Sequence, residues 1–514
     1  MTKPTKGESG GISGNRRTFL KAAGGVLTSV GVAGCAGGDG NGSGDGNGSG
    51  DGGQQTTNQS NPGTNDFSDV TFKFWDVINT QSPSAEQLMK DTIKEFEEET
   101  GATVQVNYTG FGEVAGAKWQ NNFSRGVYPP VLTFPPIAGG SFMEESSEST
   151  SFFKPFNQWK DKVDQEALDN IEWILDGSRR ANAWKKKLGM DNVLHSIPVN
   201  SAPQNPFVAR IDHFEEAGLD PEENFPPKGP EHLLEVAQTL QQDGPGDVGY
   251  QVFGHEFDYY IYMNPRAGAG NTSVGGNIDQ ATYERVSYAA DSYREAIKEN
   301  IEFYTKYDMG VPQTPGLNTE SSYGLMTDGT ISMTQYEAGD VPNIRSQAPE
   351  LWKSGNLRFA PFFEAKDGVY PGGHTTSEVA LTYAPDGTDE KEWERKQEAG
   401  IALINKLLSK DWQKQSLNKA GRIPMREDVH DTVIENTPNE ENTNWAGTFI
   451  PFGRNMPRVN SSHPEYLSVS GGVLGVRTQQ AFRGEKSPQQ VAEESTQEGN
   501  KLLREYWSDR GVEI

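Results

Sequence analysis

The stretch Val70-Thr71-Phe72-Lys73-Phe74-Trp75 decides the fold, because it opens a strand, helix and strand pattern. Apolar and polar residues alternate along it, as they do in a strand with one buried face. Residues 103–108 alternate in the same way. Two strands separated by one helix form a right-handed crossover within a parallel sheet. The chain is therefore predicted to have an α/β fold.

The segment between these strands has the signals of a helix. Pro83 and Ser84 are suited to its first turn, and Gly101 is suited to end it. One stripe of the helix is apolar, formed by Leu88, Met89, Ile93 and Phe96. Ligands of such sheets bind beyond the carboxyl ends of the strands. Trp75, Asp76 and the turn at residues 110–112 are therefore candidates for a binding site.

Several further phrases follow in a fixed order along the chain. They lie at residues 118–131, 197–200, 207–220, 226–237, 325–333, 372–381 and 399–424. In this order they resemble the extracellular solute-binding proteins of ABC importers, within the cluster of maltose-type and other sugar binders. Two positions depart from the family pattern: Pro130 stands where Asp is usual, and Lys228-Gly229 replaces a Thr-Trp pair.

The resemblance implies two α/β lobes of the periplasmic-binding-protein type, joined by three hinge crossings with a ligand cleft between them. By carry-over the crossings fall near Asn200, Tyr336 and Gly373. Lobe one is then expected to take residues 67–200 with 336–373, and lobe two residues 201–335 with 374–514. Function follows from hinge closure around a solute that contacts both lobes.

A sugar or oligosaccharide is the expected cargo, delivered to the permease subunits of an ABC transporter. A pyranose presents an apolar face to aromatic rings and a rim of hydroxyls to planar polar groups. The ligand-binding candidates are Trp75, Asp76, Tyr260, Tyr336, Glu337, His374, Arg422 and Trp445. Packing in the core or at the cleft rim is the alternative for each of them.

Other cargoes and activities stay open at this point. A sugar acid, a phosphorylated sugar, an amino acid or a peptide would need a cation such as Arg422, Arg454 or Arg458. The seven His residues are dispersed, so neither a metal site nor a cofactor is expected. A secreted glycoside hydrolase would need a pair of carboxylates, which 72 acidic residues cannot single out. We expect a carrier and not an enzyme.

The N-terminal 35 residues have the pattern of an export signal. Arg16-Arg17 precedes a short apolar run at 22–32 and the sole cysteine, Cys35. This leader resembles a twin-arginine signal with a lipoprotein box, which implies lipidation of Cys35 and a membrane anchor on the outer face of the cell. The alternative is a buried Cys in an uncleaved N-terminus. Residues 36–66 are rich in Gly, Asn, Ser and Asp, and are predicted to form a disordered tether.

The charge of the chain limits its partners. The net charge is −26 at pH 7, and removal of residues 1–35 would make it −30. Nucleic acid is excluded as a partner, because phosphate binding needs a basic face. Acidic surfaces keep proteins hydrated in concentrated salt, which indicates a halophilic source. A lone cysteine allows no disulfide within the chain, so stability must come from large cores. We also expect the protein to be a monomer.

Overall fold

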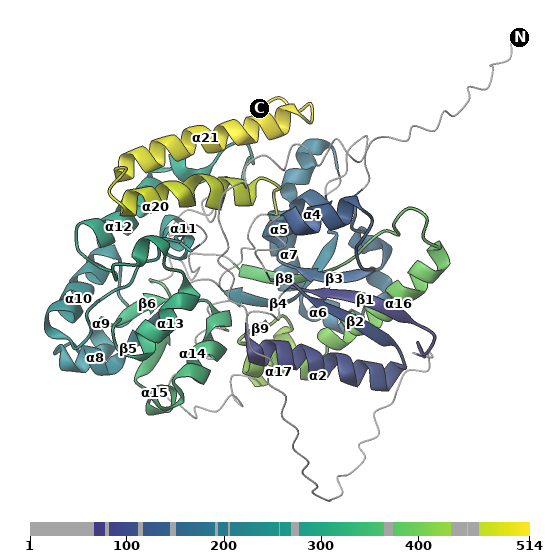
Figure 1. Cartoon of the computed structure of the whole chain (residues 1–514), viewed down its shortest axis with the longest axis horizontal. Helices are drawn as coiled ribbons and strands as arrows, with labels where there is room; N and C mark the ends of the chain where they lie inside the picture. Colours follow the sequence, from purple (N-terminus) through teal and green to yellow (C-terminus); the bar gives the residue numbers. More distant parts are fainter. Residues whose placement is uncertain are drawn as a thin grey trace, which may run out of the picture.

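The protein is described by a computed structural model that covers residues 66–77, 82–110, 117–143, 151–190, 194–203, 206–255, 258–268, 277–363, 374–432, 450 and 462–514. These residues form two α/β lobes (Figure 1). A six-stranded sheet organises lobe one, and a three-stranded sheet organises lobe two. The predicted fold class is confirmed.

The first strand, helix and strand form as the sequence predicts. Strand β1 (Thr71–Asp76) pairs in parallel with β2 (Thr103–Tyr108), and Thr71 lies opposite Thr103. Helix α2 (Pro83–Thr100) connects them and buries Leu88, Met89, Ile93 and Phe96. Ser82 caps its first turn by accepting from the amide of Ala85. The helix ends at Gly101, which adopts the left-handed conformation with φ of 74°.

Lobe one is a mixed sheet between helical layers, with the strand order β2-β1-β3-β8-β4-β9. Strand β8 lies in the middle of this sheet and pairs antiparallel with both β3 and β4. The remaining elements of the lobe are α4 (Ala117–Ser124), β3 (Val131–Phe134), α5 (Pro136–Met143), η1 (Phe156–Gln158), η2 (Lys160–Lys162), α6 (Gln165–Asn170), α7 (Glu172–Ala181), η3 (Ala183–Leu188), β4 (Ser196–Pro203), β8 (His374–Leu381), α16 (Glu390–Leu407), α17 (Lys410–Ala420), β9 (Ile423–Pro424) and η7 (Glu427–Val429).

Lobe two surrounds a smaller antiparallel sheet with the order β6-β5-β7. Its elements are β5 (Phe207–Arg210), α8 (Ile211–Glu216), α9 (Pro221–Asn224), α10 (Pro230–Asp243), α11 (Tyr260–Gly268), η4 (Ser287–Ala289), α12 (Asp291–Thr305), η5 (Thr314–Gly316), α13 (Thr319–Thr327), β6 (Met333–Gln335), η6 (Ala338–Asp340), α14 (Val341–Gln347), α15 (Pro349–Ser354), β7 (Leu357–Ala360), the π-helical η8 (Ser468–Gly475), α20 (Val476–Phe482) and α21 (Pro488–Ser508).

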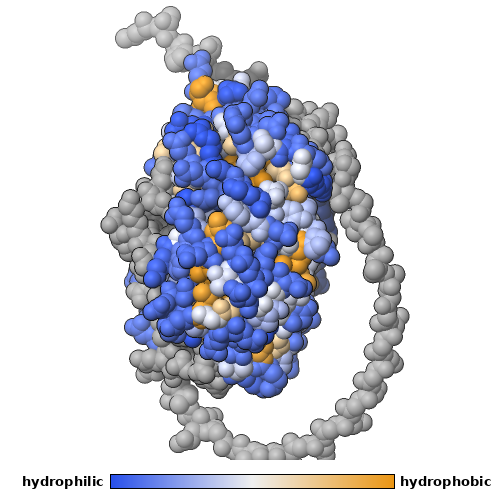
Figure 2. Space-filling model, turned by 90° about the vertical axis from the view of Figure 1, so that its left-hand side faces the viewer, coloured by the Kyte–Doolittle hydropathy of each residue, from blue (hydrophilic) through white to orange (hydrophobic). Residues whose placement is uncertain are grey.

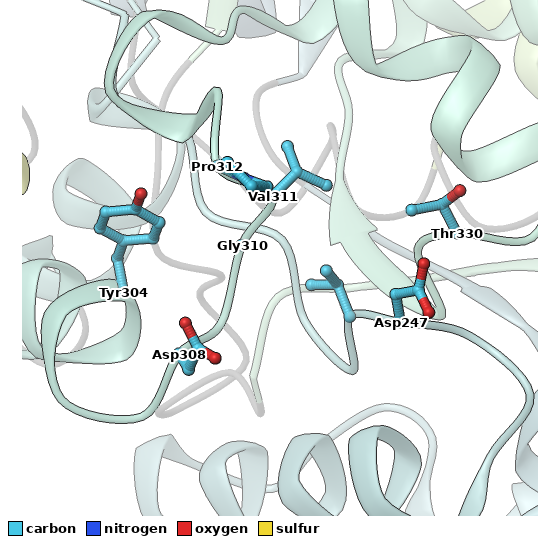
Figure 3. A pocket seen from close by; sticks show the side chains of 8 residues that line it. Asp247, Tyr304, Asp308, Gly310, Val311, Pro312 and Thr330 are labelled. Atoms are coloured by element: carbon cyan, nitrogen blue, oxygen red, sulfur yellow. The ribbon is translucent and has the colours of Figure 1, made fainter.

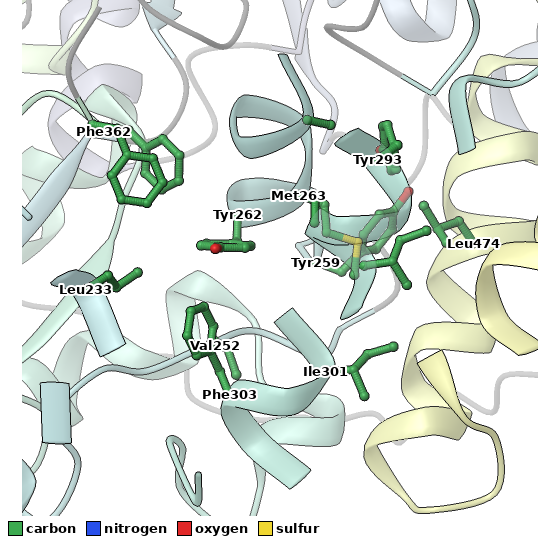
Figure 4. Packing of buried hydrophobic residues seen from close by; sticks show 14 of the residues in the cluster. Leu233, Val252, Tyr259, Tyr262, Met263, Tyr293, Ile301, Phe303, Phe362 and Leu474 are labelled. Atoms are coloured by element: carbon green, nitrogen blue, oxygen red, sulfur yellow. The ribbon is translucent and has the colours of Figure 1, made fainter. Parts of the chain in front are cut away.

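The core of lobe two is rich in aromatic side chains. Tyr262 packs against Phe303 and Phe362 with ring centroids 5.2 and 5.7 Å apart, and Leu474 of η8 joins the same cluster (Figure 4). The face of the protein shown in Figure 2 is largely hydrophilic, and its apolar spots are small and separate. A hydrated surface of this kind accompanies the acidic composition of the chain.

The strand pairing overturns two parts of the predicted division into lobes. Residues 336–363 were expected in lobe one, but β7 pairs with β5 and belongs to lobe two. Residues 374–432 were expected in lobe two, but β8 and β9 complete the sheet of lobe one. The reason is that β8 has unpaired edges of β3 and β4 to fill, which binds the segment to the first sheet.

The chain therefore passes between the lobes at other places than predicted. It leaves β4 at Pro203 and enters β5 at Phe207. It returns between β7 and β8, and it crosses once more between η7 of lobe one and η8 of lobe two. No crossing lies at Tyr336, which follows β6 inside lobe two.

The lobes share one hydrophobic cluster at their junction. Leu417 of α17 and Ile423 of β9 belong to the same buried cluster as Tyr336 and Val341 of lobe two. Gly421, between α17 and β9, adopts a left-handed conformation with φ of 64°. A methyl group there would overlap the carbonyl oxygen of Ala338, so the two lobes approach each other closely at this turn.

A second contact surrounds His463, which is fully buried. Its ring lies 4.6 Å from that of Tyr506, 5.4 Å from Trp507 and 5.5 Å from Trp184 of η3. Burial among these rings, with a smaller effect of Arg510, lowers the pKa of His463 to about 3. The imidazole is therefore neutral in the folded protein across the neutral pH range.

Within the described part of the chain, none of the helices has the length and apolar character needed to cross a bilayer. Cys35, the predicted signal at 1–35 and nearly all of the predicted tether at 36–66 lie outside the described residues.

Substitution G421A is expected to destabilise the protein more than the matched substitution G387A. Both glycines have a positive φ, at 64° and 82°, so both variants incur a left-handed strain of about 1–2 kcal/mol. Gly421 faces the other lobe, whereas no atom of the described residues lies within 4 Å of a methyl group at Gly387. Overpacking should add about 1–3 kcal/mol at Gly421. Denaturant unfolding of both variants checks this, and equal losses would show that the close approach is absent.

Substitution H463N is expected to flatten the acid limb of the stability curve. The unfolded His binds a proton below about pH 6.5, whereas folded His463 stays neutral down to about pH 3. The unfolded state then holds more protons, so the free energy of unfolding falls as the pH falls, by up to about 1.4 kcal/mol per unit. Unfolding measured at pH 7 and pH 5.5 checks this, and the same slope in H463N and wild type would contradict it.

Candidate functional site

A buried arginine occupies the junction between the lobes. Arg422 follows Gly421 in the turn between α17 and β9 of lobe one, and it is 3% exposed. Its guanidinium faces η6 of lobe two, where a methyl group at Gly339 would lie 3.1 Å from its Cζ atom. Among the residues that the structure describes, nothing forms a hydrogen bond or ion pair with this guanidinium; its backbone amide donates to Ser416. A buried cation that has no such partner among the described residues is unusual.

Carboxylates of lobe two surround this arginine. Glu337 precedes the short helix η6 and Asp340 is its last residue. The two form a capping box, in which the amide of Glu337 donates to Asp340 at 2.7 Å. Tyr260, at the start of α11, donates to Glu337 at 2.8 Å. Tyr323 of α13 donates to Asp340. These bonds hold both carboxylates in place without using the arginine.

Lobe one contributes one carboxylate to the same region. Asp76 ends β1, is fully buried and accepts from the hydroxyl of Thr133 at 2.8 Å. The same hydroxyl accepts from the amide of Val77 at 3.1 Å. Asp76 thus lies at the carboxyl edge of the sheet, as the strand pattern predicts. Asp76, Glu337, Asp340, Tyr260 and Arg422 are referred to below as the junction cluster.

The electrostatics of the junction cluster are those of one cation among acids. Burial lowers the pKa of Arg422, and Glu337, Asp340 and Asp76 oppose that shift through their negative charge. Burial also raises the pKa of Asp340 to about 7, and repulsion from Glu337 adds to it. Asp258, beside them, has a pKa well above its usual range for the same two reasons and because Asp340 repels it. Carboxylates outnumber cations here.

The predicted aromatic platforms occupy different environments. Trp75 is 5% exposed and packs 5.3 Å from Trp119 in the core of lobe one. Tyr336 is fully buried, and its hydroxyl lies 2.8 Å from that of Ser322. Both rings are buried among neighbouring side chains, and a role of either ring in solute binding stays a prediction. Tyr260 is partly exposed and belongs to the junction cluster.

Two further candidates have side chains outside the described part of the structure. His374 is the first residue of β8, opposite Pro203, and its side chain lies outside the described part. Trp445 falls in a segment outside the described residues. The sequence reasoning missed Asp340 and Tyr323. Neither carried a local signal, because the usual capping box has Ser or Thr followed three residues later by Glu or Gln, and here Glu337 and Asp340 take those places.

Known proteins resemble this chain over most of its length. A profile of the bacterial extracellular solute-binding protein family matches residues 91–442. The chain belongs to this family. The sn-glycerol-3-phosphate-binding periplasmic protein UgpB of Escherichia coli K12 is 24% identical over 333 residues, which are 61% of this chain and 68% of the relative.

Solved structures of solute-binding proteins show the same fold. An ABC transporter solute-binding protein of Thermotoga lettingae, bound with α-D-tagatose, aligns with a TM-score of 0.63 at 18% identity, over 84% of this chain and all of the other. Maltose-bound MalE3 of T. maritima aligns with a TM-score of 0.64 at 15% identity, over 84% and 100%. Membership of the solute-binding family makes this protein a carrier and not an enzyme, as predicted.

A separate pocket of about 330 Å³ lies within lobe two (Figure 3). Its lining includes Asp247, Tyr304, Asp308 and Thr330, and every lining residue belongs to lobe two. A solute held by one lobe alone has equal affinity for open and closed forms and shifts nothing. The junction cluster, which draws on both lobes, is therefore the stronger candidate for the solute site.

The wild-type protein is expected to lose stability as the pH rises toward 7, and substitution D340N is expected to remove this loss. Folded Asp340 keeps its proton up to about pH 7, whereas the unfolded residue ionises near pH 4. The folded state then holds more protons, so the free energy of unfolding falls as the pH rises through this window. The wild-type protein should lose up to about 1.4 kcal/mol per unit more than D340N. Urea unfolding at pH 5 and pH 7 checks this, and parallel curves would refute it.

Proposed function

We propose that this protein captures a neutral sugar or short oligosaccharide outside the cell and delivers it to the permease of an ABC importer. The family membership supports solute capture, and structural neighbours bound with tagatose and maltose support a sugar as the cargo. The site proposed for this cargo is the junction cluster.

The buried guanidinium of Arg422 is the observation that carries the proposal. Leaving a buried charged donor without a partner is costly. Arg422 lacks one among the described residues, although it is 3% exposed and near three carboxylates. A solute whose oxygen atoms accept hydrogen bonds from the guanidinium would remove that cost. We therefore assign to Arg422 the role of donor to the bound sugar.

The surrounding acids favour a hydroxyl-rich solute over an anion. A sugar hydroxyl accepts a hydrogen bond from Arg422 and donates one to a carboxylate such as Glu337 or Asp76. A phosphate or carboxylate group could accept from Arg422 but would be repelled by these acids. UgpB is named for a phosphorylated solute, so sn-glycerol-3-phosphate is the second candidate. The charge balance of the junction cluster argues against it.

The position of the junction cluster connects binding to closure. Arg422 and Asp76 belong to lobe one, whereas Glu337, Asp340 and Tyr260 belong to lobe two. A sugar that bonds to both groups stabilises the closed arrangement by its differential affinity for it. The permease would then recognise the closed form.

The proposal includes the location of the protein. The leader resembles a twin-arginine lipoprotein signal, and lipidated Cys35 would anchor the protein to the outer face of the membrane. The segment 36–66 would then act as the tether between anchor and lobes. We propose that the protein works there as a monomer in a salt-rich habitat.

Thermal unfolding in high salt tests the cargo. The panel contains maltose, maltotriose, D-tagatose, glucose, glucuronate and sn-glycerol-3-phosphate. A neutral sugar present at 100 times its dissociation constant should add about 2.7 kcal/mol to the stability. Small-angle scattering should show a smaller radius of gyration with that sugar. A shift with the two anions only would overturn the sugar assignment.

Substitution R422Q should weaken binding of the same sugar by about 10- to 100-fold, since hydrogen bonds to charged groups contribute about 1.5–3 kcal/mol. R422K should restore part of the affinity. R395Q is the matched control, because Arg395 forms exposed pairs with Asp69 and Glu398 in lobe one. Titration calorimetry decides, and equal affinities of R422Q and R395Q would remove Arg422 from the site.

A further inference from the structure

A second unpaired polar group lies beside Arg422. Asn200 of β4 is 1% exposed, and neither its Nδ2 nor its Oδ1 atom has a hydrogen-bond partner in the described part of the chain. A β-bulge precedes it, because the pairing with β8 shifts between Pro198 and Asn200. Bulges commonly redirect side chains next to functional sites.

The strand register places Asn200 next to Arg422. Asn200 lies opposite Pro424 and Ser201 lies opposite Ile423, so Arg422 is one residue ahead of the paired part of β9. Residues related in this diagonal way lie about 7–8 Å apart, within reach of long side chains. Within the described part of the chain their polar atoms do not bond to each other, and neither side chain has another hydrogen-bond partner there.

We infer that Asn200 is a solute-binding residue that holds the same end of the sugar as Arg422. The amide supplies two donors and an acceptor, and the guanidinium supplies donors only. Neighbouring hydroxyls on one sugar ring, each both donor and acceptor, match this pair. Asn200 is also three residues before Pro203, the last residue of β4, after which the chain passes to lobe two at the first crossing. This inference rests on the proposed function.

A buried amide without a hydrogen-bond partner does not by itself indicate a solute-binding site. Asn300 of α12 is also 1% exposed, with Nδ2 and Oδ1 unpaired within the described structure. Its helix packs in lobe two against α11, α20 and α21, and no residue of the junction cluster lies on α12, α20 or α21. Asn300 is therefore a matched control for the effect of removing a buried amide.

The experiment compares N200L with N300L in the full chain, with the panel sugar that binds wild type most tightly. Both variants remove a buried unpaired amide, so their thermal unfolding should change in similar ways. N200L should weaken sugar binding at least tenfold, and N300L should leave it within twofold. N200D should also weaken binding, because its carboxylate would pair with Arg422 and compete with the sugar. If N200L does not fold, N200S takes its place.

A double-mutant cycle tests whether Asn200 and Arg422 bind the same end of the sugar. If Asn200 and Arg422 hold neighbouring hydroxyls, the loss in N200L/R422Q should be smaller than the product of the single losses. Unchanged affinity of N200L beside weakened R422Q would overturn this inference and leave the proposed function intact. A wild type that binds none of the neutral sugars would overturn the proposed function, and this inference with it.

Discussion

The close approach of two short turns determines how the two lobes meet. The turn between α17 and β9 packs on η6 and the start of α14, with Gly421 against Ala338 and Leu417 in one cluster with Tyr336. This apolar contact joins the two lobes at the junction. It also forces the next residue, Arg422, into a place with little water, where its charge must be matched by something other than solvent.

The charged residues around this junction determine which solutes the site can bind. Each carboxylate of the junction cluster is held by its own partners, namely Thr133, Tyr260, Tyr323 or the capping box of η6. Arg422 has no such partner in the described part of the chain. A binding site built in this way is preorganised on both sides, so the entropy lost on binding falls mainly on the solute and on the relative motion of the lobes.

The sequence was sufficient where the signals are local. The helix from Pro83 to Gly101 and its two flanking strands formed as predicted, because the stripe, the cap and the alternation all lie within the same 40 residues. The lobe boundaries depended on long-range pairing. Strands β6 and β9 have three and two residues, too few for any periodic pattern. Strand β8 is buried in the middle of the sheet, and nothing in its sequence names its partners.

The residues of the candidate site also divide into those with a local sequence signal and those without one. Asp76 could be placed from the strand end, and Glu337 and Arg422 from the resemblance. The burial of Trp75 and Tyr336 could not be predicted, because an aromatic residue near a strand end has the same local pattern in a core as in a cleft. Asn200 was predicted only as the place of the first crossing. Its lack of a partner among the described residues is a property of the packed protein, which no local pattern indicates.

The central position of β8 also means that the sheet of lobe one can be completed only late in synthesis. Strands β3 and β4 leave the ribosome long before residues 374–381, and their inner edges have no partner until β8 arrives. Unpaired edges of this kind are prone to join with other chains. Lobe one therefore cannot complete its sheet during early synthesis, and a nascent chain halted before residue 374 would depend on chaperones to stay out of aggregates.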